Sequence, residues 1–167
     1  LTTGGNEWEY DGLEKYETGY TDLTHDGGGS ALVLGHKLIA VSYDTVVTVG
    51  TVDNVVEYIV ENEEITKNYA IGVSYGKLTV TPRKLSVVLS PVSNVIYGEA
   101  FEGWNGEFAY AAGSKRTVDG ETLVITVKYT RGGVEVAQPV NAGIYGVEVN
   151  EASIVGGYAD INNYQLT

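Results

Sequence analysis

The sequence carries the same ordered set of landmarks twice, and this duplication constrains the fold more than any other feature. Each set has a tyrosine followed by a turn, a glycine-led turn before a strand, and an Asn-Tyr pair near its end. The landmarks are Tyr10, Gly35 and Asn68-Tyr69 in the first set, and Tyr97, Gly120 and Asn163-Tyr164 in the second. A chain built from near-copies of one unit is expected to form an array of small modules rather than one catalytic domain.

Composition limits how such modules can be stabilised. The 167 residues include no cysteine, so two modules of about 80 residues each must fold without disulfides or thiolate-bound metal. The chain begins at Leu1, contains no methionine and shows no signal peptide. We therefore expect it to be part of a longer protein whose targeting signals lie elsewhere.

The charge of the chain argues against two classes of partner. The net charge is −12, and the ten Lys and Arg residues are scattered, with no basic run longer than Lys115-Arg116. Nucleic acid and anionic membrane surfaces would repel such a chain. No apolar stretch is long enough to span a bilayer. We expect no nucleic-acid partner and no membrane insertion in this segment.

Alternation of apolar and polar residues predicts strands along most of the chain. In residues 123–130 the odd positions are large and apolar, which is typical of a half-buried strand. The same period predicts three further sets of inward-facing residues: Ile39, Val41 and Tyr43; Val56, Tyr58 and Val60; and Tyr145, Val147 and Val149. Residues 52–65 could suit a helix, but Val and Tyr crowd a helix and alternate here, so we predict strand.

Glycine-rich turns separate the predicted strands, and Asp119-Gly120 is expected to form a tight turn before a strong strand. Many short strands with no convincing helix predict an all-β chain. Pro82 cannot donate to a ladder, so it marks a boundary between a first module at residues 1–83 and a second at 84–167. Immunoglobulin-like sandwiches are the predicted architecture, with a β-grasp variant as the alternative.

At these landmarks the chain resembles the MBG-type (mostly bacterial, glycine-rich) repeats of bacterial surface proteins. The first module resembles the Tyr-Asp-Gly variety, and the second resembles the Tyr-Gly-X variety. The segments that carry the resemblance are Tyr10-Asp11-Gly12, Gly35-His36, Val49-Gly50-Thr51 and Gly76 to Arg83 in the first module, and Tyr97-Gly98-Glu99, Gly120 to Leu123 and Ala142 to Tyr145 in the second. One departure is that the family pattern continues into a last strand of Gly-x-Leu-Thr-Val type after Asn163-Tyr164, where this sequence stops at Thr167.

The resemblance implies an extracellular chain on a bacterial cell surface or cell wall, serving as a stalk, spacer or part of an adhesin, with neighbouring repeats as its partners. It carries over no catalytic residues. The sequence agrees, because its two histidines lie near no nucleophile motif and its many carboxylates show no cleft-forming pattern. We predict that the chain is not an enzyme.

Two loops that the modules do not share are the candidate ligand sites. Asp22 and Asp26, with neighbouring glycine carbonyls, are calcium candidates, although their spacing matches no known calcium loop and we predict neither metal nor cofactor. Trp104 lies in a Gly-Trp-Asn-Gly loop, and with nearby Tyr110 it could stack on a sugar or contact a host protein. The alternative for Trp104 is packing against its own module.

The recurring tyrosines are expected to be structural. Their rings should pack at strand ends with hydroxyls bonded to backbone, and the Asn68 and Asn163 side chains should bond turn backbone nearby. The leading hypothesis is therefore a non-catalytic stalk or spacer. The alternative is a glycan- or host-protein-binding module of an adhesin.

Overall fold

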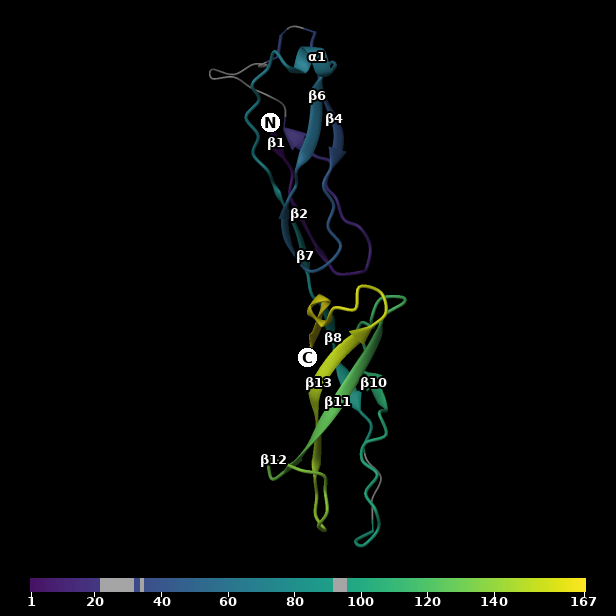
Figure 1. The fold of residues 1–167 in the computed structure, drawn as a ribbon. Helices are drawn as coiled ribbons and strands as arrows, with labels where there is room; N and C mark the ends of the chain where they lie inside the picture. Colours follow the sequence, from purple (N-terminus) through teal and green to yellow (C-terminus); the bar gives the residue numbers. More distant parts are fainter. Residues whose placement is uncertain (22–31, 34, 92–95) are drawn as a thin grey trace. The chain divides into compact units, whose positions relative to one another are not determined.

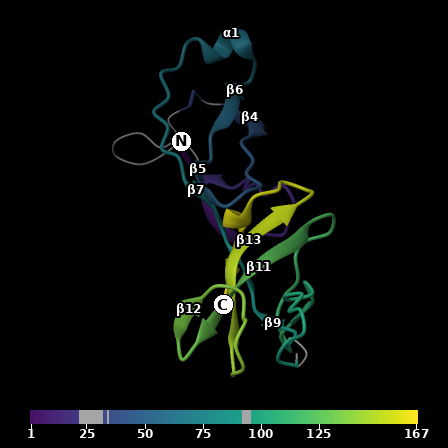
Figure 2. The same ribbon diagram turned by 60° about the horizontal axis from the view of Figure 1, so that its bottom comes forward.

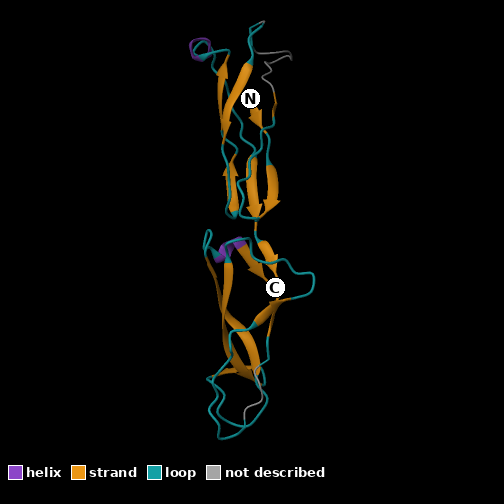
Figure 3. Ribbon diagram, turned by 90° about the vertical axis from the view of Figure 1, so that its right-hand side faces the viewer, coloured by secondary structure: helices purple, strands orange, loops and turns teal. Residues whose placement is uncertain are grey.

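The computed structural model describes residues 1–21, 32–33, 35–91 and 96–167 (Figure 1). Within these residues the chain forms fourteen strands, one α-helix of four residues and one 3₁₀ helix of three residues. This confirms the predicted all-β class, and strands dominate both parts of the chain (Figure 3). None of the described helices is long and apolar enough to cross a membrane. The chain divides into two compact units, Leu1–Thr81 (unit 1) and Pro82–Thr167 (unit 2).

The described residues of unit 1 form seven strands and the α-helix. They are β1 (Thr2–Thr3), β2 (Asn6–Glu9), β3 (Tyr20–Thr21), β4 (Leu38–Tyr43), β5 (Gly50–Asp53), β6 (Val56–Val60), α1 (Glu63–Thr66) and β7 (Lys77–Thr81). The sheet order is β2-β7-β5, with β4 paired to β6 and β1 paired to β3. Strands β2 and β7 run parallel, whereas the other pairs in unit 1 are antiparallel.

The core of unit 1 lies along β6 and β7. Tyr10, Val60 and Leu78 are completely buried, and Val80 is nearly so. Val60 packs with Leu38, and Tyr58 and Tyr69 join the same cluster from its partly buried rim. The prediction that Val56, Tyr58 and Val60 face inward is confirmed.

Unit 2, outside residues 92–95, contains the other seven strands and the 3₁₀ helix. They are β8 (Arg83–Leu85), β9 (Val87–Leu89), β10 (Phe108–Tyr110), β11 (Thr122–Arg131), β12 (Val134–Val136), β13 (Gly146–Val155), η1 (Ile161–Asn163) and β14 (Tyr164–Leu166). The long antiparallel strands β11 and β13 lie side by side, with β12 at the end of β11 (Figure 2). Strand β9 pairs antiparallel with β10, and β8 pairs parallel with β14.

One strand and two turns of unit 2 follow the sequence pattern. Leu123 and Ile125 face inward from β11, as the alternation predicts. Asp119-Gly120 is a tight turn, with the Glu121 amide donating to the Val118 carbonyl and Gly120 at a φ of 82°. Gly132 and Gly133, both at positive φ, connect β11 to β12 as the two-residue hairpin turn that their conformational freedom permits.

Bulges change which side chains face inward along two of the predicted strands. In β4, Leu38 and Ala40 face inward opposite Val60 and Tyr58, so Ile39 is 44% exposed, contrary to the prediction. Val41 is an extra residue between Ala40 and Ser42 and is 60% exposed, and after it Tyr43 is half-buried opposite Val56, as predicted. In β13, Asn150 is the extra residue opposite Thr126 and Val127, and the inward positions change from Val147 to Ala152 and Ile154. Val149 precedes the bulge and pairs with Val127, so it lies on the same face as Val147, although it is 36% exposed. One added residue reverses which face each later side chain occupies.

The prediction of strand throughout residues 52–65 is wrong at its end, where α1 begins. Asn62 caps this helix by accepting a hydrogen bond from the Ile65 amide, and Glu63 and Glu64 lie in its first turn. A capping asparagine followed by acidic residues favours a helix start over a strand. The alternating apolar pattern ends at Val60, which is where the strand ends too.

Candidate functional site

Trp104 is anchored within its own unit rather than presented freely. Its side chain is half-buried, and its indole Nε1 donates to the Ser90 carbonyl at 3.2 Å. Its amide donates to the Tyr129 hydroxyl at 2.9 Å. The indole N–H, which could have donated to a sugar hydroxyl, is therefore already bonded to the protein. Only the exposed part of the ring is open for stacking.

Tyr110 lies on β10 with a separate set of neighbours. Its ring packs edge-on to Phe108, and the Arg116 guanidinium lies 5.6 Å from the ring centroid. Its hydroxyl is 3.4 Å from the Thr117 hydroxyl. Trp104 and Tyr110, the two aromatic residues predicted to bind a ligand, therefore both interact with other residues of unit 2.

The calcium candidates Asp22 and Asp26 lie outside the described residues. Among the residues that the structure does describe, no group of three or more His, Asp or Glu side chains is arranged to hold a metal ion.

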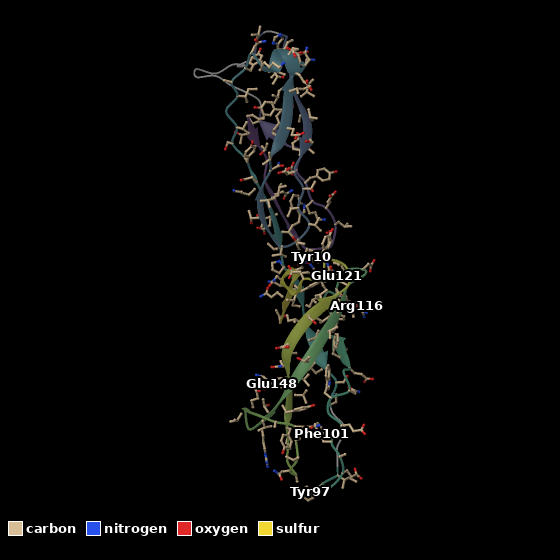
Figure 4. The ribbon with its side chains drawn as sticks, in the orientation of Figure 1. Tyr10, Tyr97, Phe101, Arg116, Glu121 and Glu148 are labelled. Atoms are coloured by element: carbon tan, nitrogen blue, oxygen red, sulfur yellow. The ribbon has the colours of Figure 1, made fainter. Side chains whose placement is uncertain are left out.

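Tyr164 and Glu121 form a buried hydrogen-bonded pair at one end of unit 2. The Tyr164 hydroxyl donates to Glu121 Oε2 at 2.6 Å and accepts from the Val118 amide at 3.0 Å. Glu121 is only 6% exposed, and its other oxygen accepts from the Tyr158 amide at 3.0 Å. Burial, together with the hydrogen bond to Glu121, raises the pKa of Tyr164 well above its ordinary value. Glu121 and Arg116 lie at the same end of unit 2, and Tyr97 lies at the other end (Figure 4).

Unit 1 contains the same arrangement with a different ionisable partner. The Tyr69 hydroxyl accepts from the Val33 amide at 3.1 Å and lies 2.7 Å from His36 Nδ1. The His36 amide donates to the Val33 carbonyl, as the Glu121 amide does to Val118. The repeated Gly35-His36 and Gly120-Glu121 turns are thus equivalent in space as well as in sequence. The predicted backbone bonds of the Asn-Tyr tyrosines are confirmed.

The other recurring residues are not equivalent. Tyr10 is completely buried, whereas Tyr97 is 75% exposed, so the prediction that both rings pack at strand ends fails for Tyr97. Asn68 is exposed and reaches the Glu64 carbonyl only at 3.5 Å, whereas Asn163 is completely buried. Sequence recurrence at these positions does not correspond to the same burial.

The most extensive arrangement in unit 1 joins its first residues to its last. Thr2 bridges Ser74 in parallel, and β2 then pairs with β7 over four registered positions, from Asn6 opposite Leu78 to Glu9 opposite Thr81. The Tyr10 amide extends this ladder by donating to the Thr81 carbonyl at 2.9 Å. We call β2 and β7 the terminal strand pair of unit 1.

A buried polar node, formed by Asn54, Thr3 and the backbone of Gly4 and Gly76, fills the gap between Thr2 and β2. Asn54 is completely buried, and its amide nitrogen donates to the Gly4 carbonyl at 2.9 Å and to the Glu17 carbonyl at 2.8 Å. The Thr3 hydroxyl donates to the backbone carbonyl of Asn54 and accepts from the backbone amide of Gly76. The two backbones lie so close that a Cβ on Gly76 would collide with the Gly4 carbonyl.

Unit 2 has a shorter terminal strand pair, β8 with β14. It contains three registered positions, from Arg83 opposite Tyr164 to Leu85 opposite Leu166. Thr167 extends it, with both its amide and its hydroxyl donating to the Leu85 carbonyl at 2.9 and 3.3 Å. Neither the parallel pairing nor the Asn54 node was predicted from the sequence, because both join segments more than 45 residues apart.

Comparisons of the chain with protein-family models, with curated proteins and with solved structures find no match.

Proposed function

We propose that this chain is a pair of non-catalytic extracellular modules that act as a stalk or spacer in a bacterial cell-surface protein, with neighbouring repeats of the same chain as their partners. The observation that supports this proposal most is that in each unit a strand near the start pairs in parallel with the last strand. Parallel terminal strands make the chain enter a unit at one end and leave it at the other. A module with this topology can be repeated in series.

The connection between the units also suits an array. Strand β7 ends at Thr81 and β8 begins at Arg83, so Pro82 is the only residue between them. Such a connection contains no flexible glycine- or serine-rich segment. The net charge of −12 would keep neighbouring copies soluble and mutually repelling.

Display on a cell surface tests this proposal. One, two and four copies of the chain would be anchored at one end and labelled with a fluorophore at the other, and the distance of the label from the membrane would be measured. We expect the distance to grow in proportion to copy number, whereas a Gly/Ser chain of equal length grows only as roughly 5–6 Å × √n for n residues. Growth no steeper than that of the Gly/Ser control would contradict the spacer function.

A second candidate function is binding of a glycan or host protein by an adhesin module. The loops of unit 2 favour it, because Tyr97 is 75% exposed and Ile144 is 93% exposed. The sequence candidates Trp104 and Tyr110 are half-buried in the same unit. A glycan array probed with the chain and with Trp104→Ala tests this function, and no binding at millimolar sugar would exclude it for glycans.

A further inference from the structure

We propose that the terminal strand pairs resist force in shear, and that unit 2 yields to a pulling force before unit 1. The proposal gives the stalk function a mechanical property and rests on that function for its biological role. Its physical basis is the strand pairing alone.

The direction of pairing determines how force reaches the hydrogen bonds. Asn6 at the start of β2 is opposite Leu78 near the start of β7. Force on the two chain ends therefore pulls β2 and β7 in opposite directions along their own axes. Hydrogen bonds run across the strands, so all registered positions take the load together instead of opening one after another. The same reasoning applies to β8 and β14.

Unit 1 has the stronger pair for three reasons. Four registered positions share the load, against three in unit 2. The Asn54 node ties the preceding segment to the same strands through bonds at Gly4, Thr3 and Gly76. Strand β7 also pairs with β5 on its other edge, whereas β8 and β14 form a two-stranded sheet.

The rates of forced unfolding depend on the barrier to breaking these bonds rather than on equilibrium stability. A longer pair that must break as a whole presents a higher barrier. Two rupture events are therefore expected when the whole chain is pulled, with the weaker belonging to unit 2.

Single-molecule force spectroscopy on the full chain, held at its N- and C-termini, tests the order. The chain contains no cysteine, so engineered disulfides can identify each event. Lys84→Cys with Gln165→Cys locks the pair of unit 2, and Glu7→Cys with Thr79→Cys locks that of unit 1; both are registered positions. We expect oxidation of the first variant to remove the lower-force rupture and oxidation of the second to remove the higher one. The opposite assignment would overturn the order.

A second pulling geometry tests the shear mechanism itself. Gly72→Cys offers a handle beside the start of the chain, and a side chain there meets no atom within 4 Å. Pulling between this position and the N-terminus opens the pair of unit 1 from one end. In shear, four registered positions share the load, whereas in this second geometry one position carries the load at a time. We therefore expect the rupture force to be roughly two- to fourfold lower in the second geometry.

Equal forces in the two geometries would refute the shear mechanism. Reduced samples of each cysteine variant must rupture at the forces of the parent chain, which shows that the substitutions leave the fold intact. The distance measurement on cells does not depend on rupture force, so a failure of this proposal is distinguishable from a failure of the spacer function.

Discussion

At the residue scale, a few buried polar side chains fix the ends of each unit. Asn54 and the Tyr164–Glu121 pair are surrounded by protein, and every polar atom they bond would be costly to leave without a partner. Unlike exposed charges, these groups affect stability through hydrogen bonds that water cannot replace. The chain has one tryptophan in each unit, so fluorescence of Trp104→Phe and Trp8→Phe variants reports on unit 1 and unit 2 separately.

Replacing Asn54 is expected to destabilise unit 1 alone. Asn54→Ala leaves the Gly4 and Glu17 carbonyls without their amide donor in a partly buried site, at a cost of about 2–4 kcal/mol for the two bonds. Urea unfolding followed by Trp8 fluorescence measures this. Asn68→Ala is the matched control, since Asn68 is exposed, and it should change stability by less than about 0.5 kcal/mol. Equal effects of the two substitutions would contradict the role of the node.

Removing the Tyr164 hydroxyl is expected to weaken unit 2. Tyr164→Phe takes one donor from the buried Glu121 carboxylate and should cost about 1–3 kcal/mol. Tyr69→Phe is the control in unit 1, where the equivalent hydroxyl bonds lie in a more exposed setting, and its cost should be smaller. Urea unfolding followed by Trp104 fluorescence compares the Tyr164→Phe variant with the parent chain.

The same pair predicts a loss of stability in alkali. Because the pKa of Tyr164 is raised in the folded state, the unfolded chain releases this proton at lower pH than the folded chain does. Below a pH of about 10 both states keep the proton, so the stability that this group contributes does not change with pH; above it, stability falls as pH rises. Unit 2 of the parent chain should therefore lose stability more steeply above this pH than unit 2 of Tyr164→Phe. Parallel curves would show that the pair does not titrate in this way.

At the scale of elements, alternation predicted which segments are strands better than it predicted which faces are buried. It was correct for Leu123 and Ile125, where β11 is regular. It failed for Ile39, because Leu38 and Ala40 take the inward positions of β4, and for Val41, because it is the extra residue of a bulge. No local pattern marks such an extra residue, since it is defined by the register with a distant strand.

Deleting Asn150 tests the bulge in β13. Without the extra residue, the strand must move Ile154 from the core to the outer face or shift its first half by one position. Loss of the burial of Ile154 would cost about 2–5 kcal/mol. Asn150→Thr keeps the residue count, and its effect should stay within about 0.5 kcal/mol. A deletion variant as stable as this control, by Trp104 fluorescence, would show that Asn150 has no such role.

At the scale of the whole molecule, the duplicated landmarks correspond to two features that both units share. Each unit pairs a strand near its start with its last strand in parallel and places an Asn-Tyr tyrosine over an equivalent glycine turn. The sequence contained the duplication and the turns, because turn residues are local signals. It did not contain the pairing of β8 with β14, which depends on bringing together segments about 80 residues apart along the chain.

The central claim is that each unit is closed by its own terminal strand pair, and unit 2 offers the most direct measurement of it. Residues 82–167 and residues 82–163, which lack β14, would be produced alone and compared by amide NMR spectra. We expect the longer piece to give dispersed resonances of a folded β unit and the shorter one to be unfolded. A folded spectrum from residues 82–163 would contradict the claim, because the unit would then be closed without its terminal strand pair.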